Sequence, residues 1–169
     1  YKELYEENRE AKIDSLKKLQ PPFSTRRGRT VYGGGGITPD VYISWDLDLK
    51  PATRKILADP NRPMFNWSAT FVRSHMDIPE HYGKFQQNWE LPANALEDFL
   101  EFATKDYNKN EKEEALKNNA YLKTILKSEI AGAKWGRDEL WGVRVTADNQ
   151  ILDALEHFNE ADAFVVNSY

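Results

Sequence analysis

The 169-residue sequence contains no cysteine and only two methionines. The absence of cysteine excludes disulfide bonds, thiolate metal sites and a cysteine nucleophile. It does not indicate a compartment, because cytosolic and exported proteins can both lack cysteine. Any catalytic or metal-binding chemistry must therefore use the other side chains.

Long apolar runs and an excess of positive charge are also missing. No stretch of the sequence is apolar over the length that a membrane-spanning helix requires, so we expect no membrane span. The first residues are highly charged and do not resemble a signal peptide. The formal net charge is -4, which argues against a general attraction to nucleic acid or to anionic lipid.

The sequence does contain the material for a folded core. Apolar residues make up 40% and charged residues 30% of the chain, a balance that is typical of globular proteins. Five tryptophans, eight tyrosines and eight phenylalanines supply large apolar surfaces for burial. The length fits one domain, or a small domain with a tail.

The first third of the sequence predicts a helix followed by a short β segment. Residues 1–19 carry a thin apolar stripe at helical spacing, which ends at two prolines. Residues 30–32 and 41–45 are rich in β-branched and aromatic residues, so they predict two strands. The four glycines 33–36 lie between these strands and predict a glycine-loop hairpin. Because an isolated hairpin is marginally stable, we expect it to belong to a larger sheet.

The pattern becomes helical after Leu49. Apolar residues recur at helical spacing in five segments, namely residues 52–58, 64–76, a helix opening at Pro92, residues 111–135 and a helix beginning near Asp148. Gly136 suits the C-terminal cap of the longest helix. The inward-facing positions expected in that helix are Leu116, Ala120, Ile125, Leu126 and Ile130, and the last helix carries Ile151, Leu152, Leu155 and Phe158.

These patterns predict a mainly α fold, α+β overall. A short glycine-loop β-hairpin precedes a helical C-terminal domain, with the boundary between residues 1–48 and 49–169. No internal repeat is visible.

The glycine run is the first candidate for chemistry, because glycine-rich loops can cradle phosphates. A phosphate loop needs a lysine and a serine or threonine after the last glycine, with a helix behind them. Here Ile37, Thr38 and Pro39 follow and lead to the expected strand, and the dinucleotide fingerprint fails for the same reason. We favour a turn that uses positive φ angles. The functional alternative is a close approach of a peptide backbone, and we expect no cofactor.

Two further patterns are interpreted without a catalytic or metal role. Ser15–Lys18 has the S-x-x-K spacing by which lysine can deprotonate serine, but the other motifs of that enzyme class are missing. His75 and His81, with Asp77 and Glu80 between them, offer four metal ligands at a spacing unlike H-E-x-x-H. A chance match and a polar loop at a helix end are the favoured interpretations, so we assign no catalytic residue and no metal ligand.

Acidic pairs and tryptophan–glycine pairs have equally ordinary explanations. Adjacent carboxylates such as Glu113 and Glu114 indicate solvated helix faces, because acid–base catalysis needs two carboxyl groups in different environments. A stacking platform for sugars or bases is the functional interpretation of Trp135 and Trp141, each of which is followed by glycine. Core packing is the favoured interpretation.

The most specific pattern spans residues 28–40, which read G-R-T-V-Y-G-G-G-G-I-T-P-D. It resembles the G-R-x-V-Y-G-G-G-G-I-x-P-D segment of the carboxy-terminal processing (tail-specific) serine peptidases in their Bacteroidetes-like form. Residues 126–131, 134–136 and 148–155 are similar to the L-K-x-x-I-A, W-G and D…A-L tail of those enzymes. The resemblance spans most of the chain, although its sharp motif is short.

The resemblance implies a parent serine endopeptidase with a PDZ domain, a Ser/Lys catalytic dyad and a C-terminal extension. In that family both dyad residues precede the glycine segment, so we expect this chain to be an inactive C-terminal fragment whose residues 1–48 end the catalytic core. The glycine segment joins a strand near the cleft, which makes candidate peptide-binding neighbours of Arg29, Gly33, Gly34, Gly35 and Gly36. A periplasmic or cell-envelope location is also implied.

Two other interpretations remain open. A non-enzymatic helical protein-interaction module would pair its hairpin with a partner strand. The peptidase interpretation predicts an exposed strand edge where a sheet continues, whereas the interaction module predicts a hairpin closed within the chain. A metal- or sugar-dependent hydrolase would rest on residues 75–81 and the tryptophans alone. The expected partners are a protein or peptide substrate held through the catalytic core, and a homo-oligomer or strand-swapped dimer is an open alternative.

Overall fold

The computed structural model describes residues 15, 19–26, 28, 30–34, 41, 43 and 47–166 of the chain. The chain divides into two compact units. One unit is formed by residues 45–152, and the other by residues 1–44 together with residues 153–169. Of the helix predicted over residues 1–19, only Ser15 and Leu19 are described, and both are helical.

Strands β1 (Pro22–Ser24) and β2 (Thr30–Tyr32) form a two-stranded antiparallel sheet in which Phe23 lies opposite Val31. The glycine run follows β2 as predicted, but β2 was expected to pair with residues 41–45 across that run, and it pairs instead with β1 across residues 25–29. The positive φ of 82° at Gly28 and its N–H bond to Thr25 O, at 2.9 Å, allow this shorter connection. Of the strand predicted over residues 41–45, only Val41 and Ile43 are described, and neither is in a strand.

The unit of residues 45–152 is helical. Its helices are α2 (Pro51–Leu57), α3 (Pro63–Ser74), α4 (Tyr82–Asn88), α5 (Ala95–Ala103), α6 (Lys109–Leu116), α7 (Asn119–Lys134) and α8 (Arg137–Arg144), followed by the 3-10 turn η2 (Val145–Ala147). Helices α9 (Asn149–Glu156) and α10 (Phe158–Val166) follow. The predicted fold class, mainly α with a short hairpin, is confirmed.

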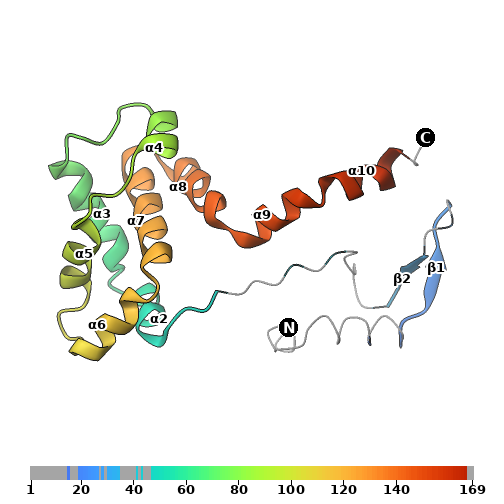
Figure 1. The fold of residues 1–169 in the computed structure, drawn as a ribbon, viewed down its shortest axis with the longest axis horizontal. Coiled ribbons are helices and arrows are strands. Elements are labelled where there is room, and N and C mark those ends of the chain that lie inside the picture. The colour runs from blue at the N-terminus through green and yellow to red at the C-terminus, as the bar shows by residue number, and fades with distance from the viewer. Residues whose placement is uncertain are drawn as a thin grey trace. The chain divides into compact units, whose positions relative to one another are not determined.

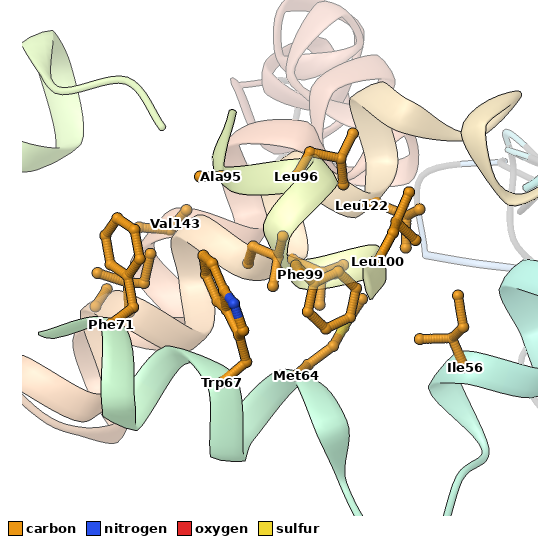
Figure 2. Packing of buried hydrophobic residues seen from close by; sticks show 14 of the residues in the cluster. Ile56, Met64, Trp67, Phe71, Ala95, Leu96, Phe99, Leu100, Leu122 and Val143 are labelled. Carbon is orange, nitrogen blue, oxygen red and sulfur yellow. The ribbon is translucent and has the colours of Figure 1, made fainter. Parts of the chain in front are cut away.

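Helix α7 lies between α3 and α8 and packs on both of them (Figure 1). Trp67 on α3 stacks on Phe71 with ring centroids 4.7 Å apart and meets the edge of Phe99 on α5 at 5.8 Å. Figure 2 shows Trp67 between these two rings, with Met64 beside them. Aromatic pairs in such geometries add to the stabilisation that burial alone provides. The core therefore joins α3, α5 and α7.

A second aromatic cluster attaches α4, which the sequence patterns did not predict. Phe85 is fully buried, stacks on Trp89 at 4.7 Å and lies 4.9 Å from the ring of Trp135 at the end of α7. Tyr82 contacts the edge of the same indole and donates a hydrogen bond to the carbonyl oxygen of Glu139 at 3.2 Å. Burial raises the pKa of Tyr82 above its usual value. A seven-residue helix is held here by aromatic contacts with distant segments.

The single helix predicted over residues 111–135 is wrong, because the chain breaks between α6 and α7 at Lys117 and Asn118. Leu116 is 44% exposed and Ala120 is exposed, although both were expected to face inward. Leu122 is fully buried in their place. The other three inward positions, Ile125, Leu126 and Ile130, are buried as predicted.

The predicted N-cap at Asp148 is confirmed, whereas the C-cap of α7 is Trp135, and Gly136, expected in that role, is the N-cap of α8. Gly136 follows α7 with a φ of 130°, a conformation that glycine adopts without a steric penalty. The Asp148 carboxylate accepts hydrogen bonds from the backbone N–H groups of Gln150 and Ile151 at 3.0 and 3.3 Å. This is the N-cap arrangement that satisfies otherwise free amides at a helix start.

Candidate functional site

The candidate glycine site is only partly described: Gly33 and Gly34 are described, and Arg29, Gly35 and Gly36 lie outside the described residues. The Gly33 amide donates to the carbonyl oxygen of Pro21 at 3.1 Å, which continues the β1–β2 pairing by one bond. A Cβ atom on Gly33 would lie 2.7 Å from the ring of Phe23. Gly34 has a φ of 105°, which L residues rarely adopt. Packing against Phe23 thus explains the glycine at position 33, and the positive φ explains the glycine at position 34. The role of both residues in peptide binding stays a prediction.

Asn118, at the break between α6 and α7, fixes the start of the helical unit. Its side-chain oxygen accepts hydrogen bonds from the Lys50 amide at 2.8 Å and from the Thr53 hydroxyl at 2.9 Å. Its side-chain nitrogen donates to the carbonyl oxygen of Asp48 at 2.9 Å. Glu114 accepts a further bond from the Ala52 amide at 3.1 Å. Since α2 has no cap of its own side chains, these contacts satisfy its first amides.

A half-buried ion pair lies between α7 and α8. The Arg144 guanidinium contacts the Glu129 carboxylate at 2.8 Å and donates to the Ser128 hydroxyl at 3.2 Å. The two ionic side chains are only 30% and 15% exposed. They line a hollow of about 140 Å³, together with apolar residues of α2 and α3 that include Leu57 and Phe65. A site of this size and polarity suits an inserted side chain or a few water molecules.

A second, wider hollow of about 440 Å³ lies between the end of α2 and the end of α5. The Lys55 ammonium sits 4.0 Å from the centroid of the Tyr107 ring and 3.1 Å from the Glu111 carboxylate. Burial raises the pKa of Tyr107 above its usual value. The Tyr107 ring and the Glu111 carboxylate are the groups at this hollow that would attract a cation, and the chain's own Lys55 already contacts both of them.

Lys127 on α7 borders a third hollow, of about 190 Å³, together with Glu90 and Lys123. Its ammonium donates to the carbonyl oxygen of Gln86 at 3.1 Å and lies 5.4 Å from the centroid of the Phe85 ring. Burial lowers the pKa of Lys127 below the usual value. A partly desolvated amine of this kind can act as a nucleophile or a base only if a substrate reaches it.

The histidine-containing loop has a packing role in the structure. His75 stacks on Phe71 with centroids 3.6 Å apart, and its Nδ1 lies 3.0 Å from the Phe71 carbonyl oxygen. Glu80 contacts the Lys134 ammonium at 3.1 Å. Among the described residues, no three histidine, aspartate or glutamate side chains gather closely enough to hold a metal ion. Lys18 of the S-x-x-K pattern lies outside the described residues.

The two tryptophan–glycine pairs differ. Trp135 packs on Phe85, as predicted, and its Nε1 donates to the Glu80 carbonyl oxygen at 3.2 Å. Trp141 is 48% exposed, so the expectation of core packing is wrong for this residue. The Arg144 guanidinium lies 5.2 Å from the Trp141 ring and covers part of it.

An exposed apolar face on α9 and the start of α10 is the feature that sequence reasoning missed. Ile151, Leu152, Leu155 and Phe158 were expected as the apolar positions of the last helix, but they are 40%, 45%, 55% and 59% exposed. Their helical spacing would have indicated the face, whereas its exposure depends on what packs against it. Exposed apolar patches of this kind are typical of interaction sites.

No family model matches this chain, and no match is found among curated proteins or among solved structures. Within the described part of the chain, no helix combines the length and the apolar character needed to span a membrane.

Proposed function

We propose that this chain is the non-catalytic C-terminal part of a carboxy-terminal processing serine endopeptidase. The observation that carries the proposal is the thirteen-residue pattern over residues 28–40, which agrees with the family segment at every fixed position. The Thr-Val-Tyr portion of this pattern forms β2, and the glycines follow directly. This order agrees with a segment that leads from a sheet strand into a glycine-rich turn.

The short sheet supports the same proposal. Within the described residues β1 and β2 pair only with each other, so each has one outer edge without a strand neighbour. Phe23 is 57% exposed beside this pairing. Because two strands alone bury too little apolar surface to be stable, further strands are expected to complete the sheet. The catalytic core of a peptidase would supply them.

The chemistry of the parent enzyme would reside outside this chain. A lysine that is desolvated beside a serine has a lowered pKa and can act as its general base near neutral pH. Backbone N–H groups would stabilise the oxyanion of the tetrahedral intermediate. This chain would then have a non-catalytic role. Its helical unit would support the structure of the enzyme, control the entry of substrate or mediate assembly.

The contacts of Asn118 support a bracing role for the helical unit. They tie residues 48–53, which follow the glycine-rich segment, to the junction of α6 and α7. A helical body attached at this point would limit the motion of the connection that leads from the sheet. A segment that controls access to a cleft requires a restraint of this kind.

The glycine segment provides a sharp test in the complete gene product. We expect Gly34→Val to lower cleavage of an unstructured, C-terminally tagged peptide at least tenfold, because valine is strained at a φ of 105°. Gly83→Val is the matched control, since a Cβ atom there meets no atom within 4 Å. Equal activity of the two variants would contradict a role of the glycine turn in the cleft.

The alternative function is a non-enzymatic helical protein-interaction module. The exposed apolar face formed by Ile151, Leu152, Leu155 and Phe158 is the observation that favours it. A complete gene product that binds proteins but cleaves no peptide would support this alternative.

A periplasmic or cell-envelope location remains a prediction of the peptidase proposal, and a homo-oligomer or strand-swapped dimer of this chain remains an open alternative. Cell fractionation tests the location, and a cytosolic product would contradict it. Light scattering of the purified chain tests the oligomeric state, and a strictly monomeric chain would exclude the alternative.

A further inference from the structure

The hollow beside the ion pair of Arg144 with Glu129 has an apolar interior and an apolar rim. Buried side chains of α2, α3 and α7 line its interior, namely Ile56, Met64 and Ile125. Leu57 and Phe65 border it as well, and both are exposed to solvent. Its volume of about 140 Å³ is close to the roughly 150 Å³ of an engineered apolar cavity that binds benzene. The hollow therefore has room for one branched or aromatic apolar side chain.

One charged group at this hollow lacks an opposite charge. The Glu129 carboxylate is taken by Arg144 at 2.8 Å, and the Asp59 carboxylate accepts a backbone N–H bond at 2.8 Å. Arg62 is exposed, and no carboxylate of the described residues forms an ion pair with it. Its guanidinium lies instead 4.5 Å from the centroid of the Phe65 ring. A carboxylate is thus the group that a complementary partner would bring to this hollow.

The backbone of Arg62 supports a role for its side chain. Arg62 precedes α3 in the left-handed conformation, with φ 50° and ψ 56°, and it is the only non-glycine residue with a positive φ in the described part of the chain. Glycine adopts this conformation without a steric penalty, whereas a residue with a Cβ atom does not. Strained positions of this kind concentrate at functional sites. The guanidinium therefore accounts better than the backbone for an arginine here.

We propose that this hollow binds an acidic segment of a partner protein, in which one apolar side chain enters the hollow and a neighbouring carboxylate pairs with Arg62. Leu57 and Phe65 extend the apolar contact beyond the hollow, and so does Trp141, whose exposed ring lies 5.2 Å from the guanidinium of Arg144. A contact surface larger than the hollow favours a protein segment over a small molecule. Aromatic and arginine side chains also dominate the binding energy of many protein interfaces.

The proposal goes beyond the peptidase assignment and does not depend on it. Every residue of the surface lies in the helical unit of residues 45–152, so the surface is complete within that unit.

Selection of a displayed library of random short peptides on the purified, complete chain tests the proposal. We expect the enriched peptides to share an aspartate or glutamate close to a leucine, isoleucine or phenylalanine. A synthetic, fluorescent copy of the most enriched peptide then serves as the probe, and fluorescence anisotropy measures its dissociation constant. The affinity should fall at molar salt, because the proposed ion pair is exposed.

Charge reversal tests the role of Arg62. Arg62→Glu should weaken binding of the probe by on the order of tenfold or more, because the carboxylate of the peptide then meets a like charge. Arg73→Glu is the matched control, since it makes the same change of charge at an exposed position near the other end of α3. We expect this control to leave the affinity unchanged within about twofold.

A phenylalanine pair tests the apolar part of the surface. Phe65→Ser should also weaken binding of the probe by on the order of tenfold. Phe102→Ser on α5 is the matched control, because both rings are 43% exposed and both lie near a basic side chain. This control should leave the affinity unchanged.

Arg62→Gly separates binding from folding. The substitution removes the guanidinium and relieves the positive φ, and this relief offsets the greater freedom of glycine in the unfolded chain. The midpoint of thermal unfolding should therefore stay close to that of the unsubstituted protein, whereas the probe should bind as weakly as it binds to Arg62→Glu. A residue with a purely structural role would not show this split.

Four results would overturn the proposal. They are the absence of any enriched peptide, enriched peptides that carry no acidic residue, a probe whose affinity ignores Arg62→Glu or Phe65→Ser, and equal effects of these variants and their controls. A dimer of the chain that Phe65→Ser dissociates would assign the surface to a second copy, and it would overturn the proposed partner as well.

Discussion

Removal of the Asn118 side chain should loosen the start of the helical unit. Asn118→Ala leaves the Lys50 amide and the Thr53 hydroxyl without their acceptor, and it also removes the bond to Asp48. Thr53 is fully buried, so water cannot replace the lost partner of its hydroxyl without local opening. A lost cap costs about 1 kcal/mol, and an unsatisfied buried hydroxyl costs about 1–3 kcal/mol.

The free energy of unfolding should therefore fall by about 2–4 kcal/mol, and the midpoint of thermal unfolding by on the order of 10 °C. Urea denaturation followed by tryptophan fluorescence measures this change, since Trp67 and Trp89 are buried. Asn118→Asp keeps the acceptor and should cost less than Asn118→Ala. The neighbouring Asn119→Ala, at an exposed position, is the matched control.

We expect Asn119→Ala to change the free energy of unfolding by less than about 0.5 kcal/mol. Equal effects of Asn118→Ala and Asn119→Ala would refute the reasoning, because the three long-range bonds would then contribute no more than one exposed amide.

Three other substitutions test the packing and the electrostatics of the helical unit. Leu122→Ala, at a fully buried position, should lower the free energy of unfolding by about 2–5 kcal/mol in urea denaturation. Gly142→Ala would place a Cβ atom in steric clash with the Tyr82 hydroxyl, so it should cost about 1–3 kcal/mol, and a double-mutant cycle with Tyr82→Phe should recover part of that cost. The Asn108 backbone N–H, and then a lysine, hold the pKa of Glu111 below its usual value of 4.5. The stabilisation from its ionised form is present above that value and is lost as the pH falls through the lowered pKa, so Glu111→Gln should flatten the loss of stability below about pH 4.5 in acid titrations. If a variant has the same unfolding curve as the unsubstituted protein, the contact that this variant tests does not contribute to stability as described.

Helices with local start signals could be predicted from the sequence. Pro51 and Pro63 occupy the first positions of α2 and α3, and both helices lie close to the predicted ranges. Helix α5 was also expected, because its apolar residues follow helical spacing over more than two turns. Local composition carries this information, so long-range contacts were not needed.

The break between α6 and α7 could not be predicted in the same way. Neither Lys117 nor Asn118 is a helix breaker of the strength of glycine or proline. The break is explained by hydrogen bonds between the Asn118 side chain and Asp48, Lys50 and Thr53. These partners lie 65 to 70 positions earlier in the chain. Tertiary contacts of this kind override local propensity, and a single sequence does not reveal them.

The candidate sites show a similar division. The glycine run was found from its composition, and the structure adds the contact of Gly33 with Phe23 and the positive φ of Gly34. The pairing of β2 with residues before the glycine run was missed, since the turn at Gly28 contains one glycine and the later run contains four. The exposure of Trp141 also escaped prediction, because no local signal distinguishes it from Trp135.

The most direct measurement is cleavage of an unstructured, C-terminally tagged peptide by this chain alone and by the complete gene product that contains it. The proposed function predicts cleavage by the complete product and none by the isolated chain. Cleavage by the isolated chain would contradict the account, because a nucleophile and its base would then have to lie within these 169 residues.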